Sequence, residues 1–322
     1  MNILIIGGAG FVGVNLVRRC LAGTGTRVSV LDSLDPLFLS TKDSLKDILD
    51  QIEFIQGDLR DERILADLVR DRDVIFNCAA QTSHSLSLKY PYLDVEINCL
   101  GNLKILEAIR MYNPEATIVF TSSSTIVGKA QHPVVDEDHP EGPLEIYSAN
   151  KGVAEKYYRI YHTAHGLKTV CLRFANLYGP FGKEHHDFGF INYFIGRART
   201  GREILIFGDG SQKRNVMYIE DAVDILLLAA REPKLIGTSF FATGDEHLSV
   251  QEIARRIVSV FQSGTIRHVE WPDQRKRMEI ENVTISSARL RAITSWQPRY
   301  NFDSGLQKTR EILAWKHGGE GK

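Results

Sequence analysis

The sequence has few cysteines and no long apolar segment. Its 322 residues include Cys20, Cys78, Cys99 and Cys171, and none of these form a CxxC pair. Scattered single cysteines argue against a disulfide framework or a cysteine-based metal site and are typical of buried thiols in a reducing compartment. No apolar run reaches the roughly 18 residues that a membrane-spanning helix needs. A strand begins directly at the N-terminus, which leaves no room for a signal peptide, so we expect a cytoplasmic protein.

The sequence also lacks an excess of charge of either sign. The formal net charge is −1, from 39 basic and 40 acidic residues. No overall field therefore attracts nucleic acid or an anionic membrane, and we expect neither as a partner. Hydrophobic residues make up 43% and charged residues 25%, as in ordinary soluble globular proteins. The length is sufficient for one large two-lobed unit or two domains.

Short apolar strands alternate with helical patterns in the first half. Buried strands that alternate with helices predict a parallel sheet covered on both faces. The expected fold class is therefore α/β, with a Rossmann-like doubly wound parallel sheet. Strands are expected at 2–6, 27–31, 52–56, 73–78, 117–120 and 169–174, and helices at 11–22, 61–70, 94–111 and 146–165.

The pattern changes after residue 176. Residues 177–186 are rich in turn formers and 208–215 are polar and loop-like. We expect residues 1–176 and a return segment of about 215–244 to form the Rossmann-like domain, and 177–214 with 245–322 to form a smaller mixed α/β lobe. Further helices are expected at 190–199, 219–230, 250–261 and 304–315, and strands at 203–207 and 238–242.

A glycine-rich loop with Gly7, Gly10 and Gly13 joins the first strand to the first helix. Glycines let the backbone approach a pyrophosphate, and the helix N-terminus presents free N–H groups and the positive end of its dipole. Asp32 follows about twenty residues on, where a carboxylate accepts both ribose hydroxyls and repels a 2′-phosphate. No arginine closely follows Asp32. The pattern predicts NAD rather than NADP.

Two further strand ends fit a nucleotide site. Asp58 follows the third strand, where it is either a turn-capping aspartate or a residue near the adenine. Ala79 and Ala80 close the fourth strand, and their small side chains leave space for a cofactor lying across the sheet edge.

Ser123, Tyr147 and Lys151 indicate alcohol oxidation. Tyr147 and Lys151 are four residues apart and share one face of the expected helix. A free tyrosine, with a pKa of about 10, is a poor base at neutral pH. A lysine ammonium beside it favours the phenolate and is expected to lower that pKa. The Ser123 hydroxyl can hold the oxygen whose proton Tyr147 takes.

In this order the motifs resemble the extended short-chain dehydrogenase/reductase family of nucleotide-sugar epimerases and dehydratases, closest to UDP-sugar 4-epimerases. The resemblance covers nearly the whole chain. It includes Asn98 and the segments 173–180, 208–215, 248–253 and 295–298.

The resemblance implies tightly retained NAD and a nucleotide diphosphate sugar held by the smaller lobe. It implies Ser123, Tyr147 and Lys151 as catalytic residues, with Tyr147 as acid and base. Implied cofactor contacts are Gly7, Gly10, Phe11, Val12, Gly13, Asp32, Ser33, Asp58, Leu59, Ala79, Ala80, Asn98, Tyr147 and Lys151. Implied substrate contacts are His84, Ser123, Ser124, Asn176, Phe207, Arg214 and Arg275.

The two residues after Ser123 favour one reaction within the family. Dehydratases of the family typically carry Asp-Glu there, and these carboxylates help to remove a proton and expel a hydroxyl. Here Ser124 and Thr125 are neither useful acids nor useful bases at pH 7. A 4-epimerase needs no second acid/base pair, so we expect 4-epimerisation of a nucleotide-activated hexose.

Two other functions stay open. A dehydratase is the first, because the loop 183–187 could supply an acid/base group for elimination. The second is an NAD-binding regulator without turnover, although such proteins tend to lose the tyrosine or the lysine. Two departures from the family pattern, Val127 in place of tyrosine and Asn215 in place of aspartate, could reflect a changed sugar or reaction.

The remaining expectations concern metal ions and self-association. His185 and His186 are adjacent, and neighbouring side chains rarely aim at one ion, so we expect no metal site. The helices near 94–111 and 146–165 carry apolar residues on more than one face. One face must cover the sheet, and the other could pair two copies, so we expect a homodimer.

Overall fold

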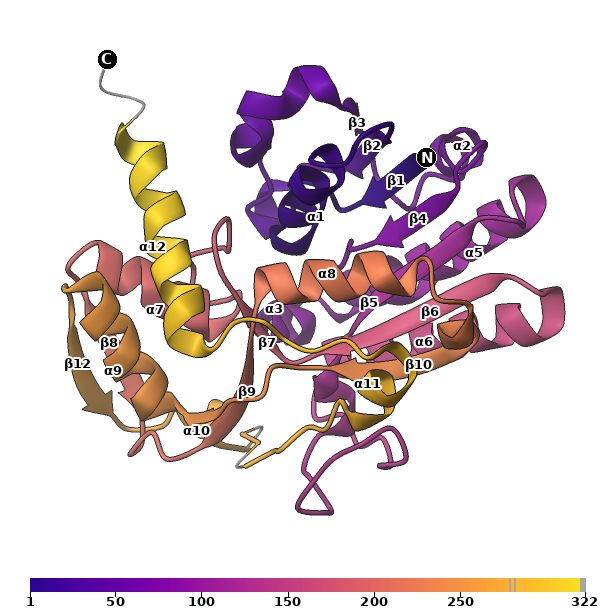
Figure 1. Cartoon of the computed structure of the whole chain (residues 1–322). Coiled ribbons are helices and arrows are strands. Elements are labelled where there is room, and N and C mark those ends of the chain that lie inside the picture. Colours follow the sequence, from indigo (N-terminus) through magenta and orange to yellow (C-terminus); the bar gives the residue numbers. More distant parts are fainter. Residues whose placement is uncertain (278, 281, 319–322) are drawn as a thin grey trace. The chain divides into compact units, whose positions relative to one another are not determined.

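Among the residues that the structure describes (1–277, 279–280 and 282–318, without the side chains of 274, 275 and 315–318), seven strands form one sheet. In this computed structural model their order is β10-β6-β5-β4-β1-β2-β3 (Figure 1). Pairing is parallel throughout β1 to β5. The expected α/β class is confirmed. The strands are β1 Asn2–Ile6, β2 Arg27–Asp32, β3 Glu53–Gln56, β4 Val74–Asn77, β5 Thr117–Ser123, β6 Lys168–Phe174 and β10 Thr238–Ala242.

The strand order reverses direction at β1. The chain runs outward from β1 through β2 to β3, then returns to β4 on the other side of β1 and continues to β5 and β6. In open parallel sheets, ligands bind outside the carboxyl ends of the strands at this switch point. The loops that follow β1, β4 and β5 are therefore the place to look for a site.

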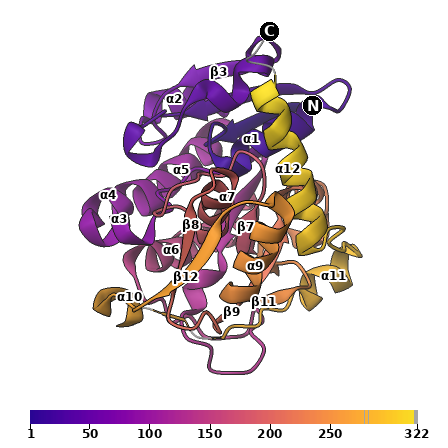
Figure 2. The same ribbon diagram turned by 90° about the vertical axis from the view of Figure 1, so that its left-hand side faces the viewer.

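The chain divides into two units by its internal contacts, and the first contains this sheet. It comprises Met1–Ile126, Glu145–Arg173 and Val223–Phe240. Apolar residues of β1, β4 and β5 pack against α2, α5 and α6 in its main core. Figure 2 shows these three helices following one another along one side. The helices are α1 Phe11–Leu21, α2 Glu62–Leu68, α3 His84–Lys89, α4 Pro91–Val95, α5 Gly101–Tyr112, α6 Ile146–His165 and α8 Ile219–Ala229.

The long helix expected at 94–111 is wrong in detail. The structure has α4, then a π-helical segment, η3 Glu96–Leu100, and then α5. Inside η3, the Asn98 amide donates to the Gln81 carbonyl at 2.9 Å and to Asp94 at 3.0 Å. A π segment carries an extra residue within a helix, and such segments are frequent at functional sites. This π segment could not be predicted from the sequence, because its polar side chains lie within an apolar helical pattern.

The second unit contains two small sheets. It comprises Val127–Leu144, Phe174–Ala222 and the chain from Phe241 onward. The loop expected at 208–215 is wrong in part, because β9 begins at Lys213 and pairs with both of its neighbours. One sheet has the order β11-β9-β7, from His247–Ser249, Lys213–Tyr218 and Asn176–Tyr178. The other pairs β12 Thr265–Val269 with β8 Glu203–Phe207.

Helices of the second unit begin at clear local signals. Ser249 caps α9 in a capping box, since its hydroxyl accepts from the Glu252 N–H at 3.1 Å and the Glu252 carboxylate accepts from the Ser249 N–H at 2.8 Å.

No helix among the described residues has the length and apolar character that a bilayer span requires. The helices are α7 Phe190–Arg199, α9 Val250–Phe261, α10 Asp273–Arg277, α11 Ala288–Thr294 and α12 Phe302–Gly318. Shorter 3-10 segments are η1 Pro36–Phe38, η2 Lys42–Gln51, η4 Ser124–Val127 and η5 Pro233–Leu235.

Candidate active site

The glycine-rich loop leads from β1 into α1 without a side-chain cap. Gly7 has φ +79°, a conformation that favours glycine. Gly10 is the N-cap of α1, and no side chain bonds the free N–H groups there. A Cβ at Gly10 would lie 3.2 Å from the Gly7 carbonyl oxygen and otherwise meet open space among the described residues. An uncapped helix start with open space in front of Gly10, followed by Phe11, Val12 and Gly13, fits a pyrophosphate.

Asp32 ends β2 beside this loop. One carboxylate oxygen accepts from the Ala9 N–H at 2.9 Å, and the other accepts from the Leu34 N–H and the Ser40 hydroxyl at 3.0 and 2.9 Å. The side chain is 7% exposed. The oxygen that accepts from Ala9 has a second lone pair, so Asp32 can still accept from a ribose hydroxyl. Ser33 follows it, and its hydroxyl accepts from the Asp35 N–H at 3.4 Å.

Asp58 is held by an arginine that sequence analysis did not single out. Arg60 donates from its backbone N–H and its Nε to one Asp58 oxygen at 2.8 and 3.0 Å, and from its guanidinium to the other at 2.7 Å. Partial burial opposes ionisation of Asp58, but the bonds and charge of Arg60 outweigh it and lower the pKa of the carboxyl. Leu59, between them, packs against the hydrophobic core.

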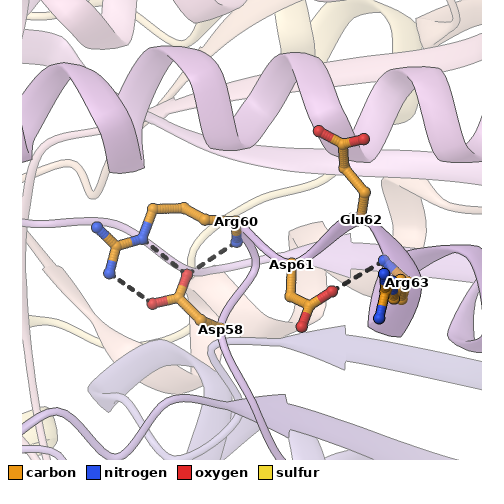
Figure 3. A pocket seen from close by; sticks show the side chains of 5 residues that line it. All are labelled: Asp58, Arg60, Asp61, Glu62 and Arg63. Carbon is orange, nitrogen blue, oxygen red and sulfur yellow. Dashed lines mark hydrogen bonds and ion pairs between the residues drawn. The ribbon is translucent and has the colours of Figure 1, made fainter.

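A shallow pocket opens at Asp58. It has a volume of about 540 Å³ and is lined by Asp58, Arg60, Asp61, Glu62 and Arg63. Figure 3 shows the Arg60 guanidinium closing on the Asp58 carboxylate, with Asp61 paired to the backbone of Arg63. The pocket lies after β3, at the same sheet edge as the glycine-rich loop. Its lining is charged and hydrogen-bonding, which fits the polar edge of a nucleotide.

The residues after β4 lie close to the glycine-rich loop. A Cβ on Gly7 would come 2.6 Å from the Ala79 N, so these two backbones touch. Ala79 and Ala80 are only half-buried. Asn98 differs from them, because it is fully buried and holds Gln81 and Asp94. Asn98 therefore holds the loop after β4 through its hydrogen bond to the Gln81 carbonyl.

Tyr147 lies in the first turn of α6, and Ser123 at the end of β5 is close enough to favour its phenolate form. It is 8% exposed. Burial raises the pKa of Tyr147 well above its ordinary value, Ser123 opposes this only in part, and the charges of Glu145 and Asp94 raise it further. The prediction of a lowered pKa is wrong for the protein chain by itself, because burial outweighs every stabilising contact.

Lys151 lies one turn further along α6 and is 2% exposed. Its Nζ is 4.1 Å from the ring centroid of Phe120. Burial lowers the pKa of Lys151 to about 8, and the Glu155 carboxylate opposes this by favouring the ammonium form. Glu155 is itself held by Arg173, with N–O distances of 2.8 to 3.1 Å, and by the Ser122 hydroxyl. The buried Glu155–Arg173 ion pair thus lies close to Lys151.

Sequence analysis did not single out Glu145, a carboxylate close to Tyr147. Glu145 is the N-cap of α6 and accepts from the Ser148 N–H at 3.0 Å. His84 Nδ1 lies 3.0 Å from the same carboxylate, and the His84 ring packs edge-on against the Tyr147 ring with centroids 5.1 Å apart. Glutamate is not one of the residues that favour an N-cap, so the sequence carries no clear signal for this position. The structure brings His84 against the Tyr147 ring.

Ser124 starts η4 directly after β5 and is 8% exposed. The other expected substrate residues lie in the second unit. The Asn176 amide donates to the Asn215 carbonyl at 2.9 Å. Arg214 forms an ion pair with Glu279 and donates to the Lys213 carbonyl at 2.8 Å. A phosphate would have to share Arg214 with Glu279.

Phe207 packs against Trp271, with ring centroids 5.3 Å apart. Sequence analysis did not single out Trp271 as Phe207's partner. Arg275 lies in α10, but its side chain falls outside the described part of the chain.

Asn215 has a structural explanation. It is 4% exposed, its amide oxygen accepts from the Ile285 N–H at 2.8 Å, and its amide nitrogen donates to the Gly244 carbonyl at 3.5 Å. An amide makes both bonds, whereas an aspartate carboxylate could not donate to a carbonyl. This departure from the family pattern therefore supports the local backbone.

The histidines at 185 and 186 do converge. Asp187 lies 3.5 Å from His185 Nδ1 and 3.6 Å from His186 Nε2, and the two rings are 4.2 Å apart. The ligand atoms of all three residues lie within 4.8 Å of one another. The geometric reason given above against a shared ion is therefore wrong.

Comparisons with known proteins point to one family. A model of the NAD dependent epimerase/dehydratase family matches residues 3–240. The chain is 28% identical to a putative UDP-glucose 4-epimerase of Methanocaldococcus jannaschii over 97% of both chains. It is 29% identical to a dTDP-glucose 4,6-dehydratase of Streptomyces niveus over 98% of this chain and 94% of that one.

A solved UDP-glucose 4-epimerase of Thermus thermophilus in complex with NAD has a TM-score of 0.86 and 27% identity, covering 98% of this chain and 99% of that chain. The fold and the Ser123, Tyr147 and Lys151 set define a short-chain dehydrogenase/reductase. More narrowly, the chain belongs to the NAD-dependent epimerase/dehydratase family. It is an enzyme of that kind, and its cofactor is NAD.

Proposed function

We propose that this enzyme catalyses the 4-epimerisation of a nucleotide diphosphate hexose, with a UDP-sugar as the substrate. The observation that carries the proposal is the buried Tyr147, close to Ser123, beside two positions that bear no carboxylate, Ser124 and Thr125. When bound, NAD supplies reversible hydride acceptance at the sugar C4.

The chain's own residues handle the proton. Ser123 orients the O4 hydroxyl of the sugar, and Tyr147 takes its proton as C4 becomes a ketone. Lys151, as an ammonium, stabilises the phenolate from which Tyr147 starts. Tyr147 then returns the proton to O4 once the ketone has turned its other face. The sugar ends inverted at C4, with no net change in oxidation state.

Groups in the second unit support a nucleotide diphosphate as the handle. Arg214 carries a guanidinium that can bind a phosphate bidentately in exchange for Glu279. The aromatic pair Phe207–Trp271 offers a ring face for a nucleobase. Asn176 and Arg275 are proposed as further contacts.

The test is product analysis of the purified enzyme with UDP-, dTDP-, GDP- and CDP-hexoses by NMR and mass spectrometry. We expect the C4 epimer of a UDP-hexose at equilibrium, without net NADH. Accumulation of a 4-keto-6-deoxy or unsaturated sugar instead would contradict the proposal.

The second candidate is a nucleotide-sugar dehydratase. The buried Glu145 beside Tyr147, with His84 bonded to it, is the observation that favours it, because elimination needs a second acid/base group near the ketone. The dTDP-glucose 4,6-dehydratase relative is as similar as the epimerase relative. The same product analysis separates the two.

Tyr147→Phe tests the role of the tyrosine. We expect kcat to fall by about 10²- to 10⁴-fold, because a phenyl ring cannot accept the O4 proton. Steady-state kinetics and NAD binding by calorimetry measure the effect, and NAD binding should persist. Phe190→Tyr, a change of similar size in α7, serves as the control. Unchanged kcat in Tyr147→Phe would remove this residue from the mechanism.

We also propose a homodimer and a cytoplasmic location. Large apolar side chains stand exposed on α4, η3, α5 and α6, among them Tyr92, Leu100, Met111 and Ile160. Such a face is typical of a protein interface. The cysteines are free thiols, as a reducing compartment favours.

A further inference from the structure

Three side chains that can bind a metal ion meet in the turn between β7 and α7. His185 Nδ1 lies 3.5 Å and His186 Nε2 lies 3.6 Å from the same Asp187 oxygen, Oδ2. The two imidazole rings are inclined by 37°, with centroids 4.2 Å apart. The three ligand atoms lie within 4.8 Å of one another, and in the described part of the chain no other group of three histidine, cysteine or acidic side chains converges in this way.

The distances in this cluster suit a shared ion. Hydrogen bonds between nitrogen and oxygen are usually about 2.7–3.2 Å long, so both contacts with the Asp187 oxygen are too long for one. Ligand atoms about 2.1 Å from a tetrahedral zinc ion lie about 3.4 Å from each other, close to both separations. His185 Nδ1 accepts from the Asp187 N–H at 3.3 Å, so this nitrogen carries the lone pair that a metal ion needs. A bound ion would take the place of this long bond.

The turn that carries the cluster is fixed by its neighbours. The Phe188 N–H donates to the His185 carbonyl at 3.0 Å, which closes a four-residue turn. Phe188 is buried, and the Lys183 Nζ lies 4.5 Å from its ring centroid. Glu184, the other acidic residue of this loop, is paired with Arg199 of α7 at 2.7 Å. The three ligands therefore need little further ordering to bind an ion.

The donor set selects the class of ion. Mg²⁺ and Ca²⁺ prefer oxygen ligands, and Asp187 is the only one of the three residues that offers an oxygen. Two imidazoles with one carboxylate are typical of Zn²⁺ and related divalent transition metals. The carboxylate argues against a phosphate here, because it repels an anion. The His185 and His186 side chains are 43% and 55% exposed, so an ion can enter from water.

We propose that His185, His186 and Asp187 form a Zn²⁺-binding site in the second unit, with water as the fourth ligand. The site goes beyond the proposed function, because the proposed epimerisation uses none of these three residues. The bound ion joins three ligands in the connection between β7 and α7. The unfolded chain does not hold these ligands in place, so binding stabilises the folded protein.

The experiment uses the full-length enzyme with bound NAD and no affinity tag, after a chelator has removed metal ions. Calorimetric titration with ZnCl₂ should show one ion per chain, and Zn²⁺ should raise the Tm by a few degrees. Co²⁺ in place of Zn²⁺ should give the visible absorption of a tetrahedral ion. Mg²⁺ should give neither binding heat nor a Tm shift.

His186→Gln and Asp187→Asn each remove one ligand. Each should weaken Zn²⁺ binding by at least about tenfold, the loss that even an outer partner of a metal ligand produces, and should abolish the Tm rise. The Tm without Zn²⁺ shows that each variant is folded. His132→Gln is the matched control, since His132 is also exposed and its ring lies 5.8 Å from that of His139, outside the cluster. It should bind Zn²⁺ as the wild type does.

The absence of binding heat and of a Tm rise in the wild type would overturn the site. Wild-type affinity in both His186→Gln and Asp187→Asn would overturn it as well, as would an equal loss in His132→Gln, because the ion would then lie elsewhere. None of these measurements depends on the product of the reaction. The site and the proposed function can therefore fail separately.

Discussion

At the scale of single residues, the site shows how burial governs chemistry. The same low-dielectric surroundings raise the pKa of Tyr147 and lower that of Lys151 to about 8. Both shifts favour the neutral forms, which are the wrong forms for starting catalysis. The neighbouring charges act in different directions, because the Glu155 carboxylate favours the lysine ammonium, whereas the Glu145 and Asp94 carboxylates oppose the tyrosine phenolate.

The pKa of Lys151 leads to a pH prediction. The ammonium is present below about pH 8 and is lost above it, so we expect kcat to fall on the alkaline side near pH 8. Glu155→Gln removes the charge that raises this pKa, so the alkaline limb should move to lower pH by about one unit. Kinetics across pH 6–10 measure the limb.

The control for this prediction is Glu115→Gln, which removes an exposed carboxylate 2.8 Å from the Lys168 Nζ. Its pH profile should match that of the wild type. Glu155→Gln leaves Arg173 without its partner and should lower the Tm, which a thermal shift assay separates from the pH effect. An alkaline limb at the wild-type pH in Glu155→Gln would exclude Glu155 as the group that tunes Lys151.

At the scale of elements, the candidate functional residues lie at the ends of strands and helices. β1 ends in the glycine-rich loop, β2 ends at Asp32, β5 ends at Ser123 and α6 begins at Glu145. Strand and helix interiors fix these ends by packing, while the ends keep unpaired backbone groups and room for a ligand. The uncapped start of α1 is the clearest case, since no described side chain caps it and its first turn contains no acidic residue.

Gly10→Ala tests this helix start. The added methyl would lie 3.2 Å from the Gly7 carbonyl oxygen, a close contact that should lower the Tm by a few degrees. The affinity for NAD should fall by about tenfold, or 1.4 kcal/mol, because the methyl fills the approach to the N–H groups. Calorimetric titration of NAD and thermal unfolding measure the two effects. Gly23→Ala, whose Cβ would lie 3.5 Å from the nearest atom, is the control. Equal NAD affinity in both variants would argue against pyrophosphate binding at Gly10.

At the scale of the whole molecule, near-neutral charge and exposed apolar side chains support the proposed dimer. A net charge of −1 provides little repulsion between copies. Leu100 is 47%, Met111 59% and Ile160 52% exposed, and all three belong to the first unit. Removing such side chains from water is the main driving force for association.

The double variant Met111→Glu/Ile160→Glu tests the dimer. We expect the wild type to scatter light as a dimer and the variant as a monomer with an unchanged Tm, because two buried charges at the interface oppose association. Size-exclusion chromatography with light scattering measures the mass. Val134→Glu changes an exposed apolar residue of the second unit and should remain dimeric. A monomeric wild type would reject the proposed dimer.

The amino-acid order alone predicted the α/β class, the strands of the main sheet and the cofactor. These follow from local patterns, namely apolar strands alternating with helices, and a glycine-rich turn whose spacing reflects backbone conformation. The shared helix position of Tyr147 and Lys151 was also predicted from their spacing, whereas their catalytic roles stay a prediction. The roles proposed for individual cofactor and substrate contacts remain predictions.

Tertiary structure decided what local patterns do not carry. The π segment around Asn98, the strand β9, the Arg60–Asp58 pair and the convergence of His185, His186 and Asp187 depend on contacts that the residue pattern does not specify. The direction of the Tyr147 pKa shift arises for the same reason. A pKa and a hydrogen bond depend on distance and burial, and these exist only once distant segments have packed together.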